Sequence, residues 1–319
     1  FNPKTGNIAI GHAALVGGDL AGNDRQVQDN IAIGRNSLNS TSDSAQTGTI
    51  AIGKNALTAL TSGAENTTLG YETLSSITTE DANVAIGYRA MSGGGGTQNI
   101  AIGADSMYQG PTGGTNYAIG RYTMMDCNAG SNALSSHTNI AMGHAALGGT
   151  WADAASNYNI AIGHTAMDAA LNGALYNMAM GYGALGSLTS GGSNVAIGHG
   201  ASTALTTGIG NITMGRGAGD AMTTNTGVIA IGYFAASALN NNNGNYSIII
   251  GYEAGQQKTS GNTDHLMGYR SGYAIITGYY NVANGTETLR YNQTGYGNVA
   301  IGYRASMNTT SSLNVSIGL

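Results

Sequence analysis

The stretch Asn7-Ile8-Ala9-Ile10-Gly11 decides the fold, because the chain repeats it from end to end. It returns, for example, as Asn30-Ile31-Ala32-Ile33-Gly34 and as Asn298-Val299-Ala300-Ile301-Gly302. The closing glycines of the eighteen copies are Gly11, Gly34, Gly53, Gly70, Gly87, Gly103, Gly120, Gly143, Gly163, Gly181, Gly198, Gly215, Gly232, Gly251, Gly268, Gly285, Gly302 and Gly318, and 17 residues is their commonest spacing. A repeat that fills the chain has to be interpreted before any single residue.

Each copy places large apolar residues three and one positions before its closing glycine, with a small residue, usually alanine, between them. This period of two, with many β-branched residues, predicts a short strand with one buried face. We expect the aliphatic pair to face the core and the alanine to point away from it. The alanines would then form a flat wall that packs against another copy, and we predict an oligomer interface at Ala9, Ala32, Ala51, Ala85, Ala101, Ala118 and Ala161.

Polar and small residues mark the turns of each copy. Asparagine stands four positions before most closing glycines, where we expect it to turn the chain into the strand and to bond the equivalent asparagine of the next copy. The glycine marks the turn out of the strand. A small residue three positions after the glycine indicates a tight inward corner, and leucine or methionine follows it as far as Leu185.

The pattern predicts an all-β protein, a parallel β-solenoid or β-roll of about 18 coils with a period near 17 residues. We expect two short strands and two turns per coil. Because a solenoid grows without starting a second core, we interpret residues 1–319 as one elongated domain. Longer spacings between glycines predict loop excursions near residues 16–29, 124–138 and 148–158.

The composition excludes several classes of function. Charged residues make up only 8% of the chain and the formal net charge is -5, so there is no basic footprint for nucleic acid and no polybasic patch for a membrane. No apolar run is long enough for membrane insertion. The single cysteine, Cys127, cannot form an intrachain disulfide, so we expect stacking of the coils to supply the stability.

The pattern Asn-x-Ala-Ile-Gly-x-x-Ala/Ser resembles the repeats of trimeric autotransporter adhesin heads and the Asn-Thr-Ala-Ile-Gly-Tyr repeats of phage tail fibres. The resemblance covers nearly all of the chain. It implies a left-handed coil and a homotrimer in which three chains pack side by side. The period near 17 residues is longer than that of the adhesin heads.

Two kinds of residue are candidates for contact with a receptor. The position after the closing glycine carries tyrosine in several copies, and an aromatic column of this kind can bind the rings of a glycan: Tyr71, Tyr88, Tyr182, Tyr233, Tyr252 and Tyr269. The alternative is that these side chains only cover the turn and lie against one another. Trp151 is a second candidate, since a lone tryptophan in a polar loop is often a recognition residue, but it can equally fold back onto the coil.

No catalytic arrangement is recognisable, so we expect no enzyme and no cofactor. The acidic residues are dispersed, and neither a nucleophile elbow nor a His-Glu-x-x-His motif occurs. His144 and His164 fall on consecutive copies, but two histidines without a third ligand make a poor zinc site. We therefore predict no metal site.

These observations predict a non-enzymatic structural or adhesive fibre segment that is extracellular, on a cell surface or a virion. Its partners would be copies of itself and possible receptors among cell-surface glycans or proteins. One alternative is a structural filament that grows by end-to-end stacking, because Phe1 and Leu319 lie so close to the first and last copies that neither shows a cap. A less favoured alternative is ice binding, against which stands the absence of a fixed threonine offset.

Overall fold

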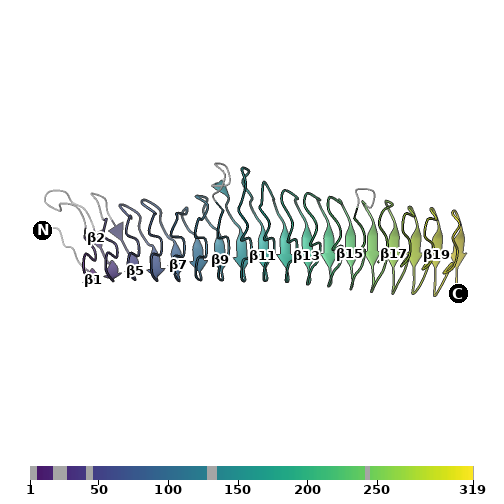
Figure 1. Ribbon diagram of the computed structural model, residues 1–319, viewed down its shortest axis with the longest axis horizontal. Coiled ribbons are helices and arrows are strands. Elements are labelled where there is room, and N and C mark those ends of the chain that lie inside the picture. The colour runs from purple at the N-terminus through teal and green to yellow at the C-terminus, as the bar shows by residue number, and fades with distance from the viewer. Residues whose placement is uncertain (1–5, 17–26, 41–45, 128–134, 241–244, 319) are drawn as a thin grey trace. The chain divides into compact units, whose positions relative to one another are not determined.

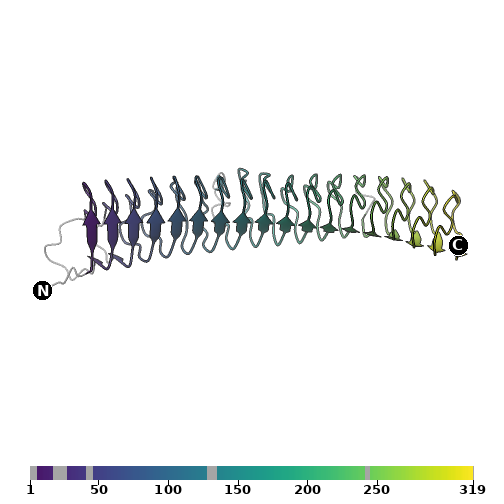
Figure 2. The same cartoon turned by 90° about the horizontal axis from the view of Figure 1, so that it is seen from below.

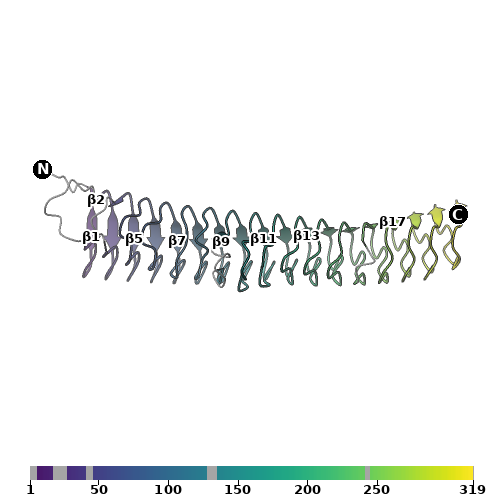
Figure 3. The same cartoon turned by 90° about the horizontal axis from the view of Figure 1, so that it is seen from above.

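The computed structural model describes residues 6–16, 27–40, 46–127, 135–240 and 245–318, and it contains no α-helix in these ranges. The chain divides into two compact units, unit 1 (Phe1–Tyr158) and unit 2 (Asn159–Leu319), which are described separately. Each unit is a parallel β-solenoid, with its strands side by side in one row and the turns to either side of that row (Figures 1, 2 and 3). None of the described segments forms a helix long and apolar enough to cross a membrane.

The strands of both units pair in parallel and in register, so equivalent positions of the repeat stack directly. The strands of unit 1 are β1 (Ile8–Ile10), β3 (Ile31–Ile33), β5 (Ile50–Ile52), β6 (Thr67–Leu69), β7 (Val84–Ile86), β8 (Ile100–Ile102), β9 (Tyr117–Ile119) and β10 (Ile140–Met142). Those of unit 2 are β11 (Ile160–Ile162), β12 (Met178–Met180), β13 (Val195–Ile197), β14 (Ile212–Met214), β15 (Ile229–Ile231), β16 (Ile248–Ile250), β17 (His265–Met267), β18 (Val282–Asn284), β19 (Val299–Ile301) and β20 (Val315–Ile317).

A coil has one regular strand, not the two that we expected. In the described part of the chain, a second ladder is confined to β2 (Val27–Gln28) with β4 (Gln46–Thr47) and to isolated bridges such as that between Leu175 and Gly192. The rest of each coil consists of turns, yet these still bond the next coil through the backbone, as Leu185 N does to Ala201 O at 3.1 Å. Turns can stack in this way because each repeats the same backbone angles as its neighbour.

The glycine row, formed by the closing glycines, must be glycine for two reasons. At Gly198 the φ angle is +137°, which side chains rarely adopt. A Cβ at this position would lie 2.5 Å from Gly215 O in the next coil. The close approach of adjacent coils therefore depends on the missing side chain.

The asparagine row, formed by the residues four positions before the closing glycines, is buried and bonds from coil to coil as expected. The Asn177 Oδ1 atom accepts hydrogen bonds from Asn194 N and from Asn194 Nδ2, both at 3.0 Å. Asn194 Nδ2 also donates to Gly208 O at 2.7 Å. Each amide thus satisfies backbone groups of the turn that water cannot reach.

The strand side chains point in the direction opposite to our expectation. The alanines face the core and the flanking aliphatic residues face outward. The predicted interface alanines Ala32, Ala51, Ala85, Ala101, Ala118 and Ala161 are all fully buried, and of the predicted set only Ala9, in the first coil, is exposed. The six buried alanines therefore cannot form a surface that meets another copy, and their assignment to the interface was wrong.

Period-two geometry explains this inversion. The asparagine and the alanine of one copy are two residues apart, so they lie on the same face of the chain. Since the asparagine must face inward to bond the backbone of the turns, the alanine faces inward with it. The interior behind the strand is then filled by larger residues from the turns, and little more than a methyl group fits between.

Two further rows fill the core. Four positions after the closing glycine, unit 1 buries Leu38, Leu57, Leu74, Met91, Met107, Met124 and Leu147. Seven positions after it, unit 2 buries Leu188, Leu205, Met222, Leu239 and Ile275. Where Ile249 and Leu266 replace the alanine of the strand, Gly255 and Gly272 stand in the first of these rows, and a Cβ on Gly255 would lie 3.2 Å from Leu266 Cδ1. In these two coils the glycines make room for the larger strand residues.

The outward positions form the outer aliphatic face, defined as the residues three and one positions before the closing glycine. In unit 2 it comprises the first and third residues of β11 to β20, and all of them are half-buried or exposed. His265 and Asn284, which look out of place in an aliphatic pattern, belong to this face and are exposed. Their copies are therefore regular, although we expected the residues at these two repeat positions to face the core.

The three expected excursions have different outcomes. Residues 17–26 of the first and 128–134 of the second lie outside the described residues, while Val27 and Gln28 form β2. The third, near 148–158, is packed against the preceding coil, since Trp151 N bonds Asp126 O at 3.0 Å and Ser156 N bonds Ser136 Oγ at 3.0 Å. The extra residues of this copy therefore widen the coil.

Candidate functional site

The predicted tyrosines form stacked columns on the turn that follows each strand. In unit 1 the rings of Tyr71 and Tyr88 stack with centroids 5.5 Å apart, and the Lys54 ammonium lies 5.3 Å from the Tyr71 centroid. Both tyrosines are exposed. The column follows from the register, because side chains at one repeat position stand one strand spacing apart.

Unit 2 has two such groups. Tyr182 stacks between His164 and His199, at 5.2 Å and 5.0 Å. Farther along, Tyr252 stacks between Tyr233 and Tyr269, at 5.0 Å and 5.6 Å. A ring inside a column has both faces in contact with its neighbours, so it offers a ligand its edge and its hydroxyl group. This arrangement matches the alternative of side chains that lie against one another.

Trp151 is fully buried, so the prediction that it contacts a receptor was wrong and the fold-back alternative is confirmed. Its indole Nε1 atom has no hydrogen-bond partner in the described part of the protein. Cys127 is also fully buried, and burial raises the pKa of its thiol well above the ordinary value. Both side chains therefore act as core residues of unit 1.

Ion pairs join consecutive coils beside the tyrosine columns. Arg89 pairs with Asp105 at 2.7 Å in unit 1, and Arg270 pairs with Glu253 at 2.6 Å in unit 2. The guanidinium of Arg270 also lies 5.2 Å from the ring centroid of Tyr269. These arginines are held by carboxylates and rings of their own unit, so they are poor candidates for binding a ligand.

Arg216 of unit 2 differs from them because no ion pair joins it to a carboxylate among the described residues. It borders a cavity of about 450 Å³, whose lining includes Gly200, Gly217, Asp220 and Phe234. Sequence reasoning missed this site. The sequence carries one sign of this site. Gly200 and Gly217 stand two positions after the closing glycines of consecutive copies, and Phe234 stands at the same position in the next copy. Where other copies carry a side chain, these leave a hollow.

A smaller cavity of about 280 Å³ lies in unit 2 beside Tyr279 and Tyr280. Ser260, Asn262 and Thr277 also line it. The Tyr279 ring stacks on that of Tyr296 at 5.0 Å and contacts that of Tyr280 edge to face at 5.3 Å. This cavity has no charged lining residue, so it offers no opposite charge to an ionic ligand.

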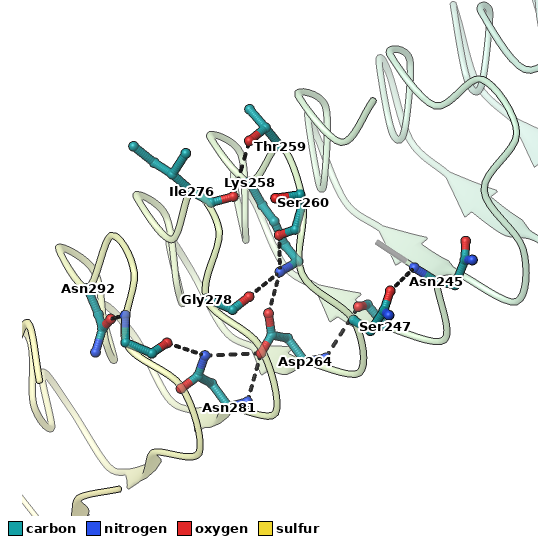
Figure 4. Close-up of polar contacts among 12 residues, drawn as sticks. Asn245, Ser247, Lys258, Thr259, Ser260, Asp264, Ile276, Gly278, Asn281 and Asn292 are labelled. Atoms are coloured by element: carbon teal, nitrogen blue, oxygen red, sulfur yellow. Dashed lines mark hydrogen bonds and ion pairs between the residues drawn. The ribbon is translucent and has the colours of Figure 1, made fainter. Parts of the chain in front are cut away.

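A buried ion pair interrupts two of the core rows of unit 2. Lys258 stands in the row that otherwise holds Leu239 and Ile275, and Asp264 stands in the asparagine row. The Lys258 ammonium also donates to Ser260 O at 2.8 Å and Gly278 O at 2.9 Å, while Asn281 N donates to Asp264 Oδ1 at 2.7 Å (Figure 4). Burial lowers the pKa of Lys258 and raises that of Asp264. With both side chains sealed from solvent, the pair has no access to a substrate.

No group of three or more histidine, cysteine, aspartate or glutamate side chains that could hold a metal ion occurs among the residues that the structure describes. No model of a known protein family matches the sequence, and no curated protein matches it. The repeat and the fold nevertheless define a class. The chain is a parallel β-solenoid repeat protein.

Proposed function

We propose that the chain is a non-enzymatic segment of an extracellular fibre, a phage tail fibre or a cell-surface adhesin, whose copies associate side by side through the outer aliphatic face. The observation that carries this proposal is the composition of that face. Along β11 to β20 it consists of half-buried or exposed isoleucine, valine and methionine, interrupted by His265 of β17 and Asn284 of β18. Continuous exposed apolar patches on soluble proteins mark surfaces that bind another protein.

The size of the face supports a second copy of this chain as its partner. Ten strands at roughly 4.8 Å spacing and three residues at roughly 3.3 Å each give about 43 Å by 10 Å, or roughly 430 Å² per copy. Two copies bury roughly twice this area, which approaches the 1,000 Å² or so of a specific interface before neighbouring side chains are counted. A flat and regular face fits a surface of the same repeat best, because ridges of equal spacing can interlock.

The resemblance to adhesin heads and tail-fibre repeats favours a trimer over a dimer. In this version the outer aliphatic faces of three copies meet at a common axis. The alanine wall that we first expected there lies inside each coil. The tyrosine columns would remain exposed beside the interface and face a receptor with their edges.

Light scattering on the purified chain tests the proposal. We expect a trimeric mass for the wild type and a monomeric mass for Ile231→Lys, because a charge on the outer aliphatic face cannot be buried without a partner. Asn240→Lys is the matched control, since Asn240 is exposed in the same copy but away from that face. A compact monomer of the wild type, or equal loss of association in both variants, contradicts the proposal. Electron microscopy and thermal hysteresis test the filament and ice-binding alternatives.

A further inference from the structure

We propose that the cavity beside Arg216 binds a sugar residue that carries a carboxylate, as a terminal or internal unit of an acidic glycan. This site is separate from the outer aliphatic face. It rests on the proposed function only for the source of the glycan, which would be a cell surface. The argument starts from the shape of the cavity and then takes its charges.

Two glycines and an aromatic ring help to line the cavity. Gly200 and Gly217 have φ angles of +66° and +62°. A Cβ on Gly217 would lie 2.3 Å from Phe234 Cε1, so the Phe234 ring lies against the backbone of Gly217 and forms an apolar wall. The volume of about 450 Å³ is within the range of small-molecule sites and accommodates one or two sugar rings.

Arg216 supplies the group that would bind an anion. Its guanidinium lies 5.8 Å from the ring centroids of both Tyr233 and Phe234, which hold it at the cavity without neutralising it. A planar guanidinium binds a carboxylate through two parallel hydrogen bonds. Arg270, which stands two positions after its closing glycine and not one, already has a carboxylate partner in Glu253.

The other polar groups favour a sugar over a simple anion. Asp220 lines the same cavity, and its negative charge opposes a multiply charged ligand such as phosphate. A carboxylate of this kind accepts hydrogen bonds from sugar hydroxyl groups. Ser187, Thr203 and His199 add further polar groups to the lining. The combination of one cation, one hydroxyl-binding anion and an aromatic wall fits a singly charged, hydroxyl-rich ring.

Titration of the full chain with methyl β-D-glucuronoside, followed by ligand-observed NMR, tests the inference, with methyl β-D-glucoside as the neutral isostere. We expect the glucuronoside to bind at least about tenfold more tightly than the glucoside, and Arg216→Gln to remove this difference. Arg121→Gln is the matched control, because Arg121 follows a closing glycine of unit 1 and lies 4.3 Å from the ring centroid of Tyr122, as a stacked arginine that does not line this cavity.

A second variant tests the cavity independently of charge. Gly200→Asn fills this part of the lining with a residue that tolerates a positive φ, and we expect it to abolish binding while the unfolding curve stays close to that of the wild type. Equal binding of the two glycosides, retained preference in Arg216→Gln, or inorganic sulfate binding as tightly as the glucuronoside would overturn the inference. Light scattering on the same samples reports self-association, so the two proposals fail or hold separately.

Discussion

Lys258 and Asp264 form an ion pair in the core of unit 2, where both side chains are fully shielded from solvent. The repeat identifies what they replace, namely a leucine or isoleucine and an asparagine. We expect Lys258→Leu with Asp264→Asn to leave the free energy of unfolding unchanged or to raise it by about 1–4 kcal/mol, because desolvation of a buried pair offsets its attraction. Either single substitution leaves polar groups unpaired and should cost about 3–5 kcal/mol. Urea denaturation measures all four proteins, and a large loss in the double variant would contradict this account.

The same pair predicts a pH dependence. Since burial lowers the pKa of Lys258 in the folded state below 10.5, the unfolded chain binds more protons just below that value and stability rises with pH there. Since burial raises the pKa of Asp264 above 3.8, the folded chain binds more protons just above that value and stability falls as pH rises there. The advantage of the double variant over the wild type should therefore be largest near neutral pH. Denaturation at about pH 4, 7 and 10 checks this, and a constant difference would refute it.

The asparagine row predicts a large cost for Asn194→Ala. The substitution leaves Asn211 N and Gly208 O without the partners that Asn194 provides at 3.0 Å and 2.7 Å. Two buried backbone groups without partners should cost about 2–5 kcal/mol together. Asn240→Ala, an exposed asparagine of the same unit, should change stability by less than about 0.5 kcal/mol. Similar losses in the two variants would show that the row does not carry the stability.

The glycine row predicts a sharp contrast between two glycines of adjacent copies. Gly198→Ala brings a Cβ to 2.5 Å from Gly215 O and should cost about 3 kcal/mol or more, through strain and displacement of the next coil. Gly183→Ala also has a positive φ, +61°, but nothing lies within 4 Å of its Cβ. That variant should cost about 1–2 kcal/mol. Thermal unfolding followed by circular dichroism ranks the two, and the reverse order is incompatible with the stacking described above.

Trp151 is the single tryptophan, so its fluorescence reports on its burial directly. We expect emission at short wavelength and weak quenching by acrylamide. Trp151→Phe should change stability by less than about 1.5 kcal/mol, since it keeps the apolar ring and removes a buried N–H without a partner, whereas Trp151→Ala should cost about 3–5 kcal/mol. Quenching as strong as that of free tryptophan would show that Trp151 is exposed in a loop, which is the first of the two alternatives that the sequence offered.

The sequence was a better guide to the fold than to the candidate site. The repeat predicts the tyrosine columns, because side chains at the same position of successive copies stack on one another. These columns are Tyr71 with Tyr88, and Tyr233 with Tyr252 and Tyr269. The cavity at Arg216 does not, since it depends on which neighbouring side chains are absent. Trp151 shows the same limit, because a polar stretch such as residues 148–158 can leave the coil or widen it, and only its contacts with Asp126 and Ser136 decide between the two.

By itself, the sequence determined the parallel stacking, the glycine and asparagine rows and the period, since each of these depends on one residue type that recurs at one offset. The tertiary structure decided which way the strand faces. Hydrophobicity favoured an inward isoleucine pair, but Asn194 and Ala196 share a face, and the asparagine must reach the backbone of the next turn. The alternation along the strand shows only that asparagine and alanine share one face and the two aliphatic residues share the other. The hydrogen bonds between coils determine which of these two faces is buried. That choice turns the alanines into core and the aliphatic residues into the surface on which association would depend.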